Sequence, residues 1–416
     1  MSNASNKTSF YITEISATDH PFIKQNNINF AIPDGSKKDI IITGRNGFGK
    51  STLLTAIRGL ISQLWAKRNS VNQFFVQQTA QRKAHLQRKQ KFESLSNPTI
   101  QEQLNFNNQC VSVAQHGFLL DAKINDISSI HEAEHVLGYF EAKRMTQLQK
   151  PNNITAPNVG KDAIGNNTSG QKFLAHLVNR RSQLAFANEE GELEEAQQIR
   201  TWFDNLDGLF SLVFEKPVKL KFIRDQLDFV IQANDGEIID IKKLSDGYSA
   251  IISIVTEIIT RMEAISFGRL DIGGIVLIDE IETHLHVALQ KKILPFLNTM
   301  FPNIQFIVTT HSPFVLASAN NALIYDIATG KQMDSEDEIW KYGFDDIVEG
   351  YFDTDSHSDD LEMKVDEFEK LSANVSQHSV DETRRFILLK NELEDAPTFK
   401  LPHIELRLRQ LGLKKG

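Results

Sequence analysis

The stretch of sequence that decides the fold reads Ile40-Ile41-Ile42-Thr43-Gly44-Arg45-Asn46-Gly47-Phe48-Gly49-Lys50-Ser51. An apolar strand leads into a glycine-rich turn. A helix follows, because large apolar residues recur at helical spacing from Leu53 to Leu64. This order of strand, glycine turn and helix is that of a phosphate-binding loop. The sequence therefore predicts an α/β fold that binds a nucleotide.

The residue types of this turn suit phosphate chemistry. Glycines let the backbone curl into a nest whose N–H groups point at phosphate oxygens, and the following helix adds its positive N-terminal end. We expect the ammonium of Lys50 to neutralise the β and γ phosphates of ATP, and the hydroxyl of Ser51 to ligate Mg²⁺. The residues expected to bind ATP are Gly44, Arg45, Asn46, Gly47, Phe48, Gly49, Lys50, Ser51 and Thr52.

A second apolar strand, Ile275 to Ile278, ends in the carboxylates of Asp279 and Glu280. The last side chains of a parallel strand emerge at the carboxyl edge of the sheet, where ligands of open α/β sheets bind. We therefore expect Asp279 to hold Mg²⁺, through water, and Glu280 to polarise the attacking water.

A third strand, Ile304 to Val308, is followed by His311. A helix predicted over Val287 to Leu297 would join this strand to the preceding one, and such a strand–helix–strand unit indicates a parallel sheet buried on both faces. At the shared edge, an imidazole can hydrogen-bond the γ phosphate and orient water. Glu280 and His311 are thus the expected catalytic residues.

Composition and charge exclude several classes of protein. With 416 residues, 41% hydrophobic and 24% charged, the chain is neither collagen-like, nor a coiled coil alone, nor globally disordered. Its single cysteine, Cys110, allows no intrachain disulfide and no cysteine-based zinc site. Met1 to Ile12 is polar and contains no apolar core of signal-peptide length, and no apolar run reaches the roughly 18 residues of a membrane helix. We expect a cytoplasmic protein without a membrane partner.

Changes in composition suggest the domain organisation. We expect an ATPase domain over residues 1–350, containing a polar, partly helical insertion at 66–109 and a helical subdomain at 169–217. The basic run at 81–91 is either a solvated helix face or a contact for nucleic acid phosphates or an acidic partner. Residues 351–416 form an acidic, then helical appendage.

Two apolar stripes mark that appendage, and they either pack on the core of the chain or dock a partner. Their members are Leu361, Val365, Phe368 and Leu371, then Phe386, Leu388, Leu389 and Leu393.

Leu244-Ser245-Asp246-Gly247-Tyr248 precedes a long apolar helix, with Ser245 placed to cap it. Together with the phosphate loop, Asp279 to His286 and Thr309 to Pro313, it resembles the AAA-family ATPases of ATP-binding-cassette type in the RecF/SMC-related branch. That branch includes the ATPase parts of OLD-family nucleases and of the anti-phage systems Septu (PtuA) and PARIS (AriA). The resemblance implies a P-loop NTPase fold, with a mixed sheet flanked by helices.

The resemblance also implies a mechanism. Ser245, Asp246 and Gly247 would form a signature motif that contacts the γ phosphate of ATP held by a second protomer, and Glu282 to His286 would form a D-loop at the dimer seam. A homodimer, or a higher homo-oligomer, would close around two ATP molecules as a switch. Its setting would be a bacterial defence complex in which a separate effector, a nuclease or a toxin, acts.

Two rival functions stay open at this stage, namely a RecF-like repair factor that binds DNA directly and a scaffold that binds ATP with little hydrolysis. Arg144 and Gln147 lie beyond the strand expected to lead to a Q-loop, so they are candidate nucleotide sensors. Metal sites at His284 and His286 or in Asp353-Thr354-Asp355 are not expected, because a third ligand or an apolar setting is missing. The tail is also too short for a Toprim nuclease.

Overall fold

The computed structural model describes residues 10–18, 27–66, 80, 84, 110–115, 118–125, 135–144, 148–154, 170–335, 359–372 and 379–395. The chain divides into two compact units, Met1–Tyr342 and Gly343–Gly416. Most of the predicted insertion at 66–109, the sensor candidate Gln147 and the pair Asp353 and Asp355 lie outside the described residues. Within the described part of the chain, no helix is both long and apolar enough to span a bilayer.

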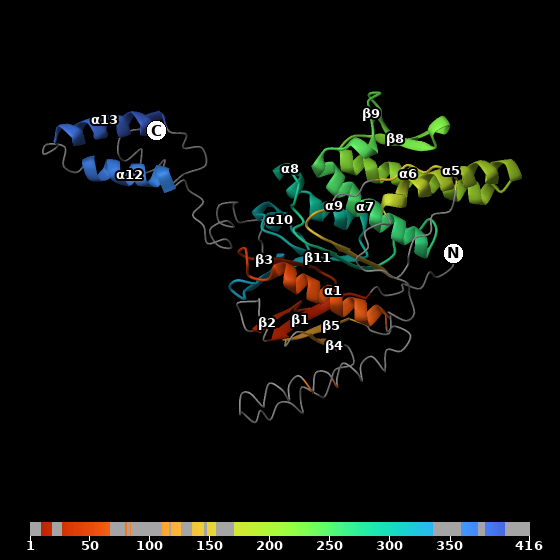
Figure 1. Cartoon of the computed structure of the whole chain (residues 1–416), viewed down its shortest axis with the longest axis horizontal. Coiled ribbons are helices and arrows are strands. Elements are labelled where there is room, and N and C mark those ends of the chain that lie inside the picture. The colour runs from red at the N-terminus through yellow and green to blue at the C-terminus, as the bar shows by residue number, and fades with distance from the viewer. Residues whose placement is uncertain are drawn as a thin grey trace. The chain divides into compact units, whose positions relative to one another are not determined.

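A six-stranded sheet forms the centre of the first unit (Figure 1). Five strands run parallel in the order β12-β3-β11-β10-β6, and β13 adds an antiparallel edge beside β12. The strands are β3 (Asp39–Thr43), β6 (Val136–Phe140), β10 (Gly274–Ile278), β11 (Ile304–Thr309), β12 (Ala322–Asp326) and β13 (Gln332–Asp334). This mixed sheet flanked by helices confirms the predicted fold class.

An antiparallel sheet packs on the other side of the first helix, α1 (Lys50–Ala66). Its strands, in the order β2-β1-β5-β4, are β1 (Ile12–Thr18), β2 (Asn27–Ala31), β4 (Cys110–Gln115) and β5 (Phe118–Ile124). Residues such as Leu53 and Ile57 of α1, Ile15 of β1 and Ile307 of β11 share one buried core. The helix behind the phosphate loop is thus covered by apolar residues from both sheets.

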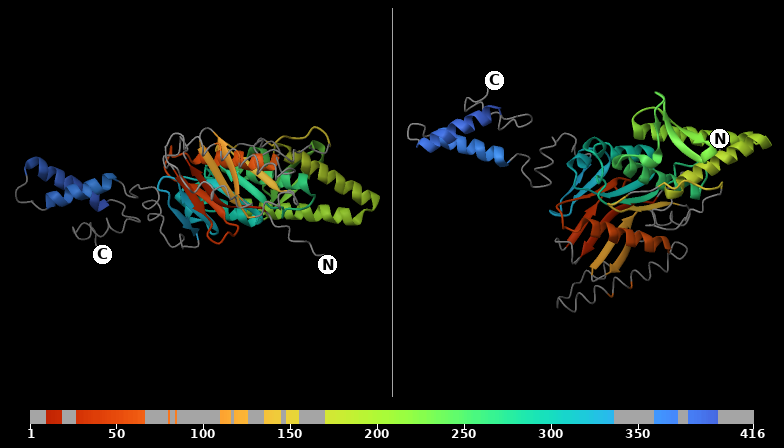
Figure 2. Two further views of the ribbon diagram at one scale, coloured as in Figure 1. Left: turned by 90° about the horizontal axis from the view of Figure 1, so that it is seen from below. Right: turned by 45° about the horizontal axis from the view of Figure 1, so that its top comes forward.

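Two long helices form a lobe beside the sheet, α5 (Phe173–Glu190) and α6 (Leu193–Phe214) (Figures 1 and 2). Gly191 ends α5 with a φ of 79°, which a glycine adopts without strain. A three-stranded antiparallel sheet follows, made of β7 (Val218–Ile223), β8 (Asp228–Ala233) and β9 (Ile238–Ile239). The chain then enters α7 (Asp246–Ile265), the long apolar helix expected from the sequence.

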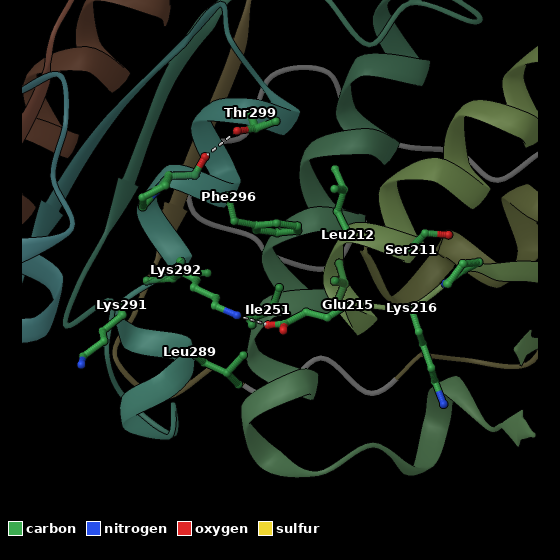
Figure 3. Close-up of a pocket in the computed structure, with 14 residues that line it drawn as sticks. Ser211, Leu212, Glu215, Lys216, Ile251, Leu289, Lys291, Lys292, Phe296 and Thr299 are labelled. Carbon is green, nitrogen blue, oxygen red and sulfur yellow. Dashed lines mark hydrogen bonds and ion pairs between the residues drawn. The ribbon is translucent and has the colours of Figure 1, made fainter.

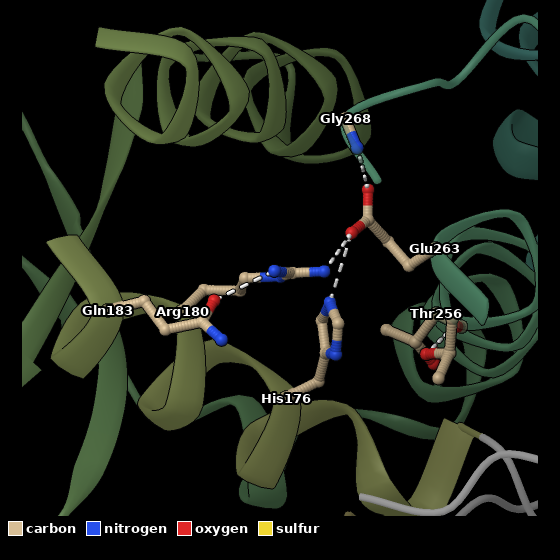
Figure 4. Close-up of polar contacts among 7 residues, drawn as sticks. His176, Arg180, Gln183, Thr256, Glu263 and Gly268 are labelled. Carbon is tan, nitrogen blue, oxygen red and sulfur yellow. Dashed lines mark hydrogen bonds and ion pairs between the residues drawn. The ribbon is translucent and has the colours of Figure 1, made fainter. Parts of the chain in front are cut away.

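Buried polar contacts attach α7 to its neighbours. The carboxylate of Glu263 accepts hydrogen bonds from the Arg180 guanidinium at 3.3 Å and from Gly268 N at 3.0 Å, and it lies 3.3 Å from His176 Nε2 (Figure 4). On the same helix, Arg261 pairs with Glu257 at 2.7 Å and donates to a carbonyl of β6 at 3.1 Å. Because buried charged groups need partners, these bonds hold α7 in one position.

The helix predicted over Val287 to Leu297 is wrong as one element. The structure has two shorter helices, α8 (Val287–Gln290) and α9 (Ile293–Met300), separated at Lys291 and Lys292. A continuous helix would require the N–H of residue 295 to bond the carbonyl of Lys291, but residue 295 is a proline and has no N–H. In the first turn of a new helix, the same proline is tolerated.

The second unit is a pair of helices, α12 (Asp359–Ser372) and α13 (Val380–Asp395). Val365, Phe368, Leu389 and Leu393 form a small core of their own, and Phe368 stacks on Phe386 with ring centroids 4.8 Å apart. The two predicted stripes therefore cover each other. Leu388 is an exception, because 48% of its surface is exposed.

Candidate functional site

The phosphate loop connects β3, in the middle of the six-stranded sheet, to α1. Gly44, Gly47 and Gly49 have φ values of 131°, 80° and 92°, which side chains rarely tolerate. A Cβ atom at Gly44 would lie 2.8 Å from Asp326 Oδ1, so only glycine fits there. At Gly47 a Cβ atom would meet nothing within 4 Å, so this part of the loop faces open space.

Lys50 lies at the inner side of this loop. Its ammonium donates hydrogen bonds to the carbonyls of Gly44 at 2.8 Å and Arg45 at 3.0 Å. Burial lowers the pKa of Lys50, while the nearby carboxylates of Glu280, Glu282, Asp279 and Asp326 oppose that shift. Lys50 is therefore a buried side chain whose amine is held against backbone carbonyls of the loop.

The structure brings Ser51 and Asp279 together, although they are far apart in the sequence. Ser51 Oγ donates to Asp279 Oδ1 at 3.0 Å, and Thr309 Oγ1 donates to the same oxygen at 2.5 Å. A hydroxyl beside a carboxylate suits a hard divalent cation such as Mg²⁺, which prefers oxygen ligands. Two protein oxygens are too few for its octahedral shell, so phosphate and water oxygens would have to supply the rest.

Glu280 follows in a strained turn, with a φ of 44°. Two backbone carbonyls of this turn accept hydrogen bonds from Arg144, that of Asp279 at 2.7 Å and that of Glu280 itself at 2.6 Å. The backbone N–H of Glu280 donates to Thr309 Oγ1 at 2.7 Å. Its carboxylate accepts from Thr283 Oγ1 at 3.1 Å. Hydrogen bonds with Arg144, Thr309 and Thr283 therefore hold the turn that presents this carboxylate.

Arg144 was a candidate nucleotide sensor, and the structure places it behind the turn instead. Both terminal nitrogens of its guanidinium contact backbone carbonyls, and only 4% of the residue is exposed. Burial lowers the pKa of Arg144 to about 10, against the opposing charges of Glu282, Asp279 and Glu280. Its partners are main-chain atoms, so the side chain serves to hold the carboxylate-bearing turn.

Glu282 ties the same loop to the residues after β11. Its carboxylate accepts from the backbone N–H of His311 at 2.5 Å and from Thr310 Oγ1 at 2.7 Å. Burial raises the pKa of Glu282, and these hydrogen bonds oppose the shift. The resemblance implied Glu282 only as the first residue of a D-loop at a dimer seam, without these partners.

His311 lies at the carboxyl edge of the sheet, as expected, in the loop before α10 (Pro313–Ala317). Its side chain is half-buried. Burial and the positive charge of Lys50 lower the pKa of His311, against the opposing charges of Glu280 and Asp279, which favours a neutral imidazole that can donate one hydrogen bond.

Ser245 and Asp246 are exposed at the start of α7. Ser245 occupies the N-cap position, but its hydroxyl makes no capping hydrogen bond, in contrast to the role expected for it. Gly247 packs against the loop after the carboxylates, because a Cβ atom there would lie 3.2 Å from the carbonyl oxygen of His284 and 3.3 Å from Leu289. The signature segment and the predicted D-loop are therefore neighbours within one chain.

The histidine pair at 284 and 286 lacks the features of a metal site. His286 Nδ1 accepts a hydrogen bond from Ala288 N at 3.4 Å and so caps α8. Among the residues that the structure describes, no three histidine, cysteine or acidic side chains are grouped as metal ligands.

Residues 123–317 match the protein family described as "AAA domain, putative AbiEii toxin, Type IV TA system". This segment contains Ser245, Asp279, Glu280 and His311, whereas the phosphate loop lies before it.

Individual proteins are also similar to this chain. "Retron Ec83 probable ATPase" of Escherichia coli is 30% identical over 194 residues, which are 42% of this chain and 36% of the relative. "Septu protein PtuA" of Bacillus mycoides (strain KBAB4) is 46% identical over 76 residues, which are 18% of this chain and 11% of the relative. The matched parts thus span well under half of these relatives. A solved SMC head bound to the C-terminal winged-helix domain of ScpA is 14% identical, with a TM-score of 0.38, over 79% of this chain and 99% of that chain.

Proposed function

We propose that this chain, which carries an AAA-family ATPase domain homologous to retron ATPases and Septu PtuA, binds ATP with Mg²⁺ and hydrolyses it as a dimeric switch. The observation that carries the proposal is the meeting of Lys50, Ser51, Asp279 and Glu280 at one edge of the sheet, with Ser51 and Asp279 in direct contact at 3.0 Å. A charged amine, a hydroxyl and two carboxylates in this arrangement suit phosphoryl transfer to water.

Each residue has a distinct role in this proposal. Lys50 and the loop N–H groups bind the β and γ phosphates. The oxygens of Ser51 and Asp279 would hold Mg²⁺, which when bound would supply neutralisation of the phosphate charge. Glu280 accepts a proton from the attacking water, and neutral His311 donates a hydrogen bond to the γ phosphate. Arg144 and Glu282 keep Glu280 and the backbone of His311 in place.

The same proposal places a second copy of the chain opposite the site. Ser245 and Asp246 are exposed, and the Ser245 hydroxyl has no capping bond to give up. A helix N-terminus with free N–H groups attracts anions, so α7 can contact the γ phosphate of ATP held by another protomer. ATP binding then closes a head-to-tail homodimer, or a higher homo-oligomer, and hydrolysis opens it.

We further propose that this switch controls a separate effector, a nuclease or a toxin, in an anti-phage system of the cytoplasm. The support is the kinship with a retron ATPase and a Septu protein.

Two substitutions test the ATPase. Lys50→Ala should abolish ATP binding measured by calorimetry, because the clustered phosphate charge loses its main counter-charge.

Glu280→Gln should retain ATP binding but release phosphate at least about a hundredfold more slowly, as expected when a general base is lost. The matched controls are Lys219→Ala and Glu237→Gln, which change exposed residues of the β7–β9 sheet. Unchanged ATP affinity in Lys50→Ala, or turnover by Glu280→Gln close to that of wild type, would contradict the proposal.

A further inference from the structure

A pocket of about 650 Å³ lies away from the phosphate loop, between the end of α6, the start of α7 and the α8–α9 segment (Figure 3). This volume lies within the usual range of ligand-binding pockets. Its wall is mainly apolar and includes Leu212, Ile251, Leu289 and Phe296. Leu212, at 50% exposure, is a large apolar residue that the chain leaves open to solvent.

The hydroxyl groups in the wall already have partners within the chain. Ser211 Oγ donates to the carbonyl of Asp207 at 2.7 Å and accepts from Val218 N at 3.0 Å. Thr299 Oγ1 donates to the carbonyl of Pro295 at 2.8 Å (Figure 3). Each hydroxyl thus uses its only O–H inside the chain and cannot donate to a sugar, a base or another polar metabolite, so apolar burial and charge carry most of the selection of an occupant.

The charged residues of the lining are mostly basic, on a chain whose net charge is -9. Lys292 meets Glu215 at 2.7 Å, as Figure 3 shows, but both side chains are more than half exposed, and such a pair contributes little stability. Lys291 lies over the ring of Phe314, with its ammonium 5.1 Å from the ring centroid. Lys216 is paired with Glu237. Lys292 points at Glu215, whereas Lys291 points away from the apolar wall (Figure 3), so carboxylates of an incoming partner would meet these two lysines at the rim of the pocket.

We propose that this pocket is the docking site for an acidic amphipathic helix of a partner protein. Apolar side chains on one face of the helix enter between Leu212 and Phe296, and its acidic residues face Lys291 and Lys292. This is the pattern of a helix bound in a groove, with apolar anchors spaced by three or four residues. Complementary charge then selects acidic partners over basic ones.

The site adjoins the signature motif. Leu289 of the wall touches the position of Gly247, and Ile251 lies one turn further along α7. Tyr248 stacks on Phe214, with ring centroids 5.3 Å apart, beside the pocket residues of α6. An occupant would thus contact the elements that carry the signature motif and the D-loop. Any effect of the occupant on ATP binding or hydrolysis rests on the proposed function, whereas docking itself does not.

The test is a selection of random short peptides displayed on phage against the immobilised full chain without nucleotide, followed by fluorescence anisotropy of the enriched peptides. We expect acidic sequences with apolar residues three or four positions apart. Leu212→Asp, and separately Lys291→Glu combined with Lys292→Glu, should each weaken their binding about tenfold or more. The controls Leu193→Asp on α6 and Lys219→Glu on β7 change exposed residues outside the pocket and should leave binding unchanged. Circular dichroism checks that each variant is folded.

Several outcomes would overturn the proposal. These are no enrichment, enrichment of neutral or basic peptides, or binding that is insensitive to Leu212→Asp. Self-association of the nucleotide-free chain that Leu212→Asp abolishes would assign the pocket to a second copy instead. Binding of 1-anilinonaphthalene-8-sulfonate that depends on the pocket residues, without peptide binding, would assign it to a small anionic amphiphile. None of these binding measurements requires ATP. A negative result would therefore contradict the docking site without contradicting the proposed ATPase activity.

Discussion

At the scale of single residues, the edge of the sheet that we propose as the ATPase site depends on side chains that hold other groups in position. Arg144 is the strongest case, because it bonds the carbonyls of Asp279 and Glu280 across a turn with a φ of 44°. A lysine has one ammonium in place of the planar guanidinium, so it cannot bond both carbonyls with the same geometry. A substitution of Arg144 therefore tests whether the position of this backbone turn affects the rate of ATP hydrolysis.

Arg144→Lys should lower kcat for ATP hydrolysis about tenfold or more while leaving the affinity for ATP unchanged, because the change misplaces Glu280 without touching the phosphate loop. Steady-state phosphate release and calorimetry measure the two quantities. Arg200→Lys, which alters an exposed residue of α6, is the control. A loss of ATP affinity with little change in kcat would instead restore the role of nucleotide sensor.

Asp39, at the start of β3, should make stability depend on pH. Burial raises the pKa of Asp39 to about 6, although Phe306 N and Asn298 Nδ2 donate hydrogen bonds to it. A pKa above that of the unfolded chain means that the stabilising contribution is complete below about pH 4 and is lost as the pH rises through about 6.

Asp39→Asn removes this titration. The variant should therefore gain stability relative to wild type between about pH 4 and 7, by on the order of 3 kcal/mol for a shift of about two pKa units. Urea unfolding at a series of pH values measures the difference between the two proteins. A difference that stays constant across this range would mean that Asp39 does not titrate as described.

At the scale of elements, α7 links the proposed dimer seam to the core. Its first turn carries the exposed Ser245 and Asp246, and its last turns are held by the buried pair Glu257 and Arg261 and by Glu263. A helix anchored at one end and exposed at the other can present its N-terminus to a second protomer without rearranging.

Ser245→Arg should block ATP-dependent dimerisation and leave ATP binding to the same protomer intact, because a large cation would occupy the space for the partner's phosphate. Light scattering with ATP, in a Glu280→Gln background, measures the dimer. Asn234→Arg, in the exposed turn after β8, controls for the added charge. Normal dimerisation by the serine variant would exclude the head-to-tail arrangement.

At the scale of the whole molecule, the second unit has its own small core. Val365 and Phe368 of α12 are buried with Leu389 and Leu393 of α13, and an ion pair of 2.6 Å between Arg385 and Glu367 joins the two helices. Truncation between α12 and α13 would therefore expose an apolar face, whereas truncation at the boundary between the units would keep each core whole.

Deletion of residues 343–416 should leave a folded protein that binds ATP like the full chain, because the boundary separates two cores. Deletion of residues 373–416 should instead give a protein that aggregates, because it removes α13, whose apolar residues bury Val365 and Phe368. Size-exclusion chromatography and calorimetry compare the two. An unfolded first unit after the longer deletion would show that the units depend on each other.

Local sequence was sufficient for the central strands, the phosphate loop and the edge where Asp279, Glu280 and His311 meet. Each of these rests on a short run of residues whose backbone preferences and apolar pattern agree, so few alternative structures compete. The same local reasoning wrongly predicted one helix over Val287 to Leu297, because it followed the apolar spacing and gave no weight to Pro295. A proline has no N–H to donate, so the first helix cannot continue through it.

Only the tertiary structure decided what Arg144, Glu282 and the pocket beside α7 do. Arg144 reaches a carbonyl 135 residues away, and Glu282 meets His311 across 29 residues. Such contacts depend on the order of strands in the sheet and on how α6, α7 and α8 pack, and no short window of sequence encodes either. The sequence by itself therefore determined which residues meet at the edge of the sheet, whereas tertiary packing decided which side chains hold that edge and where the pocket lies.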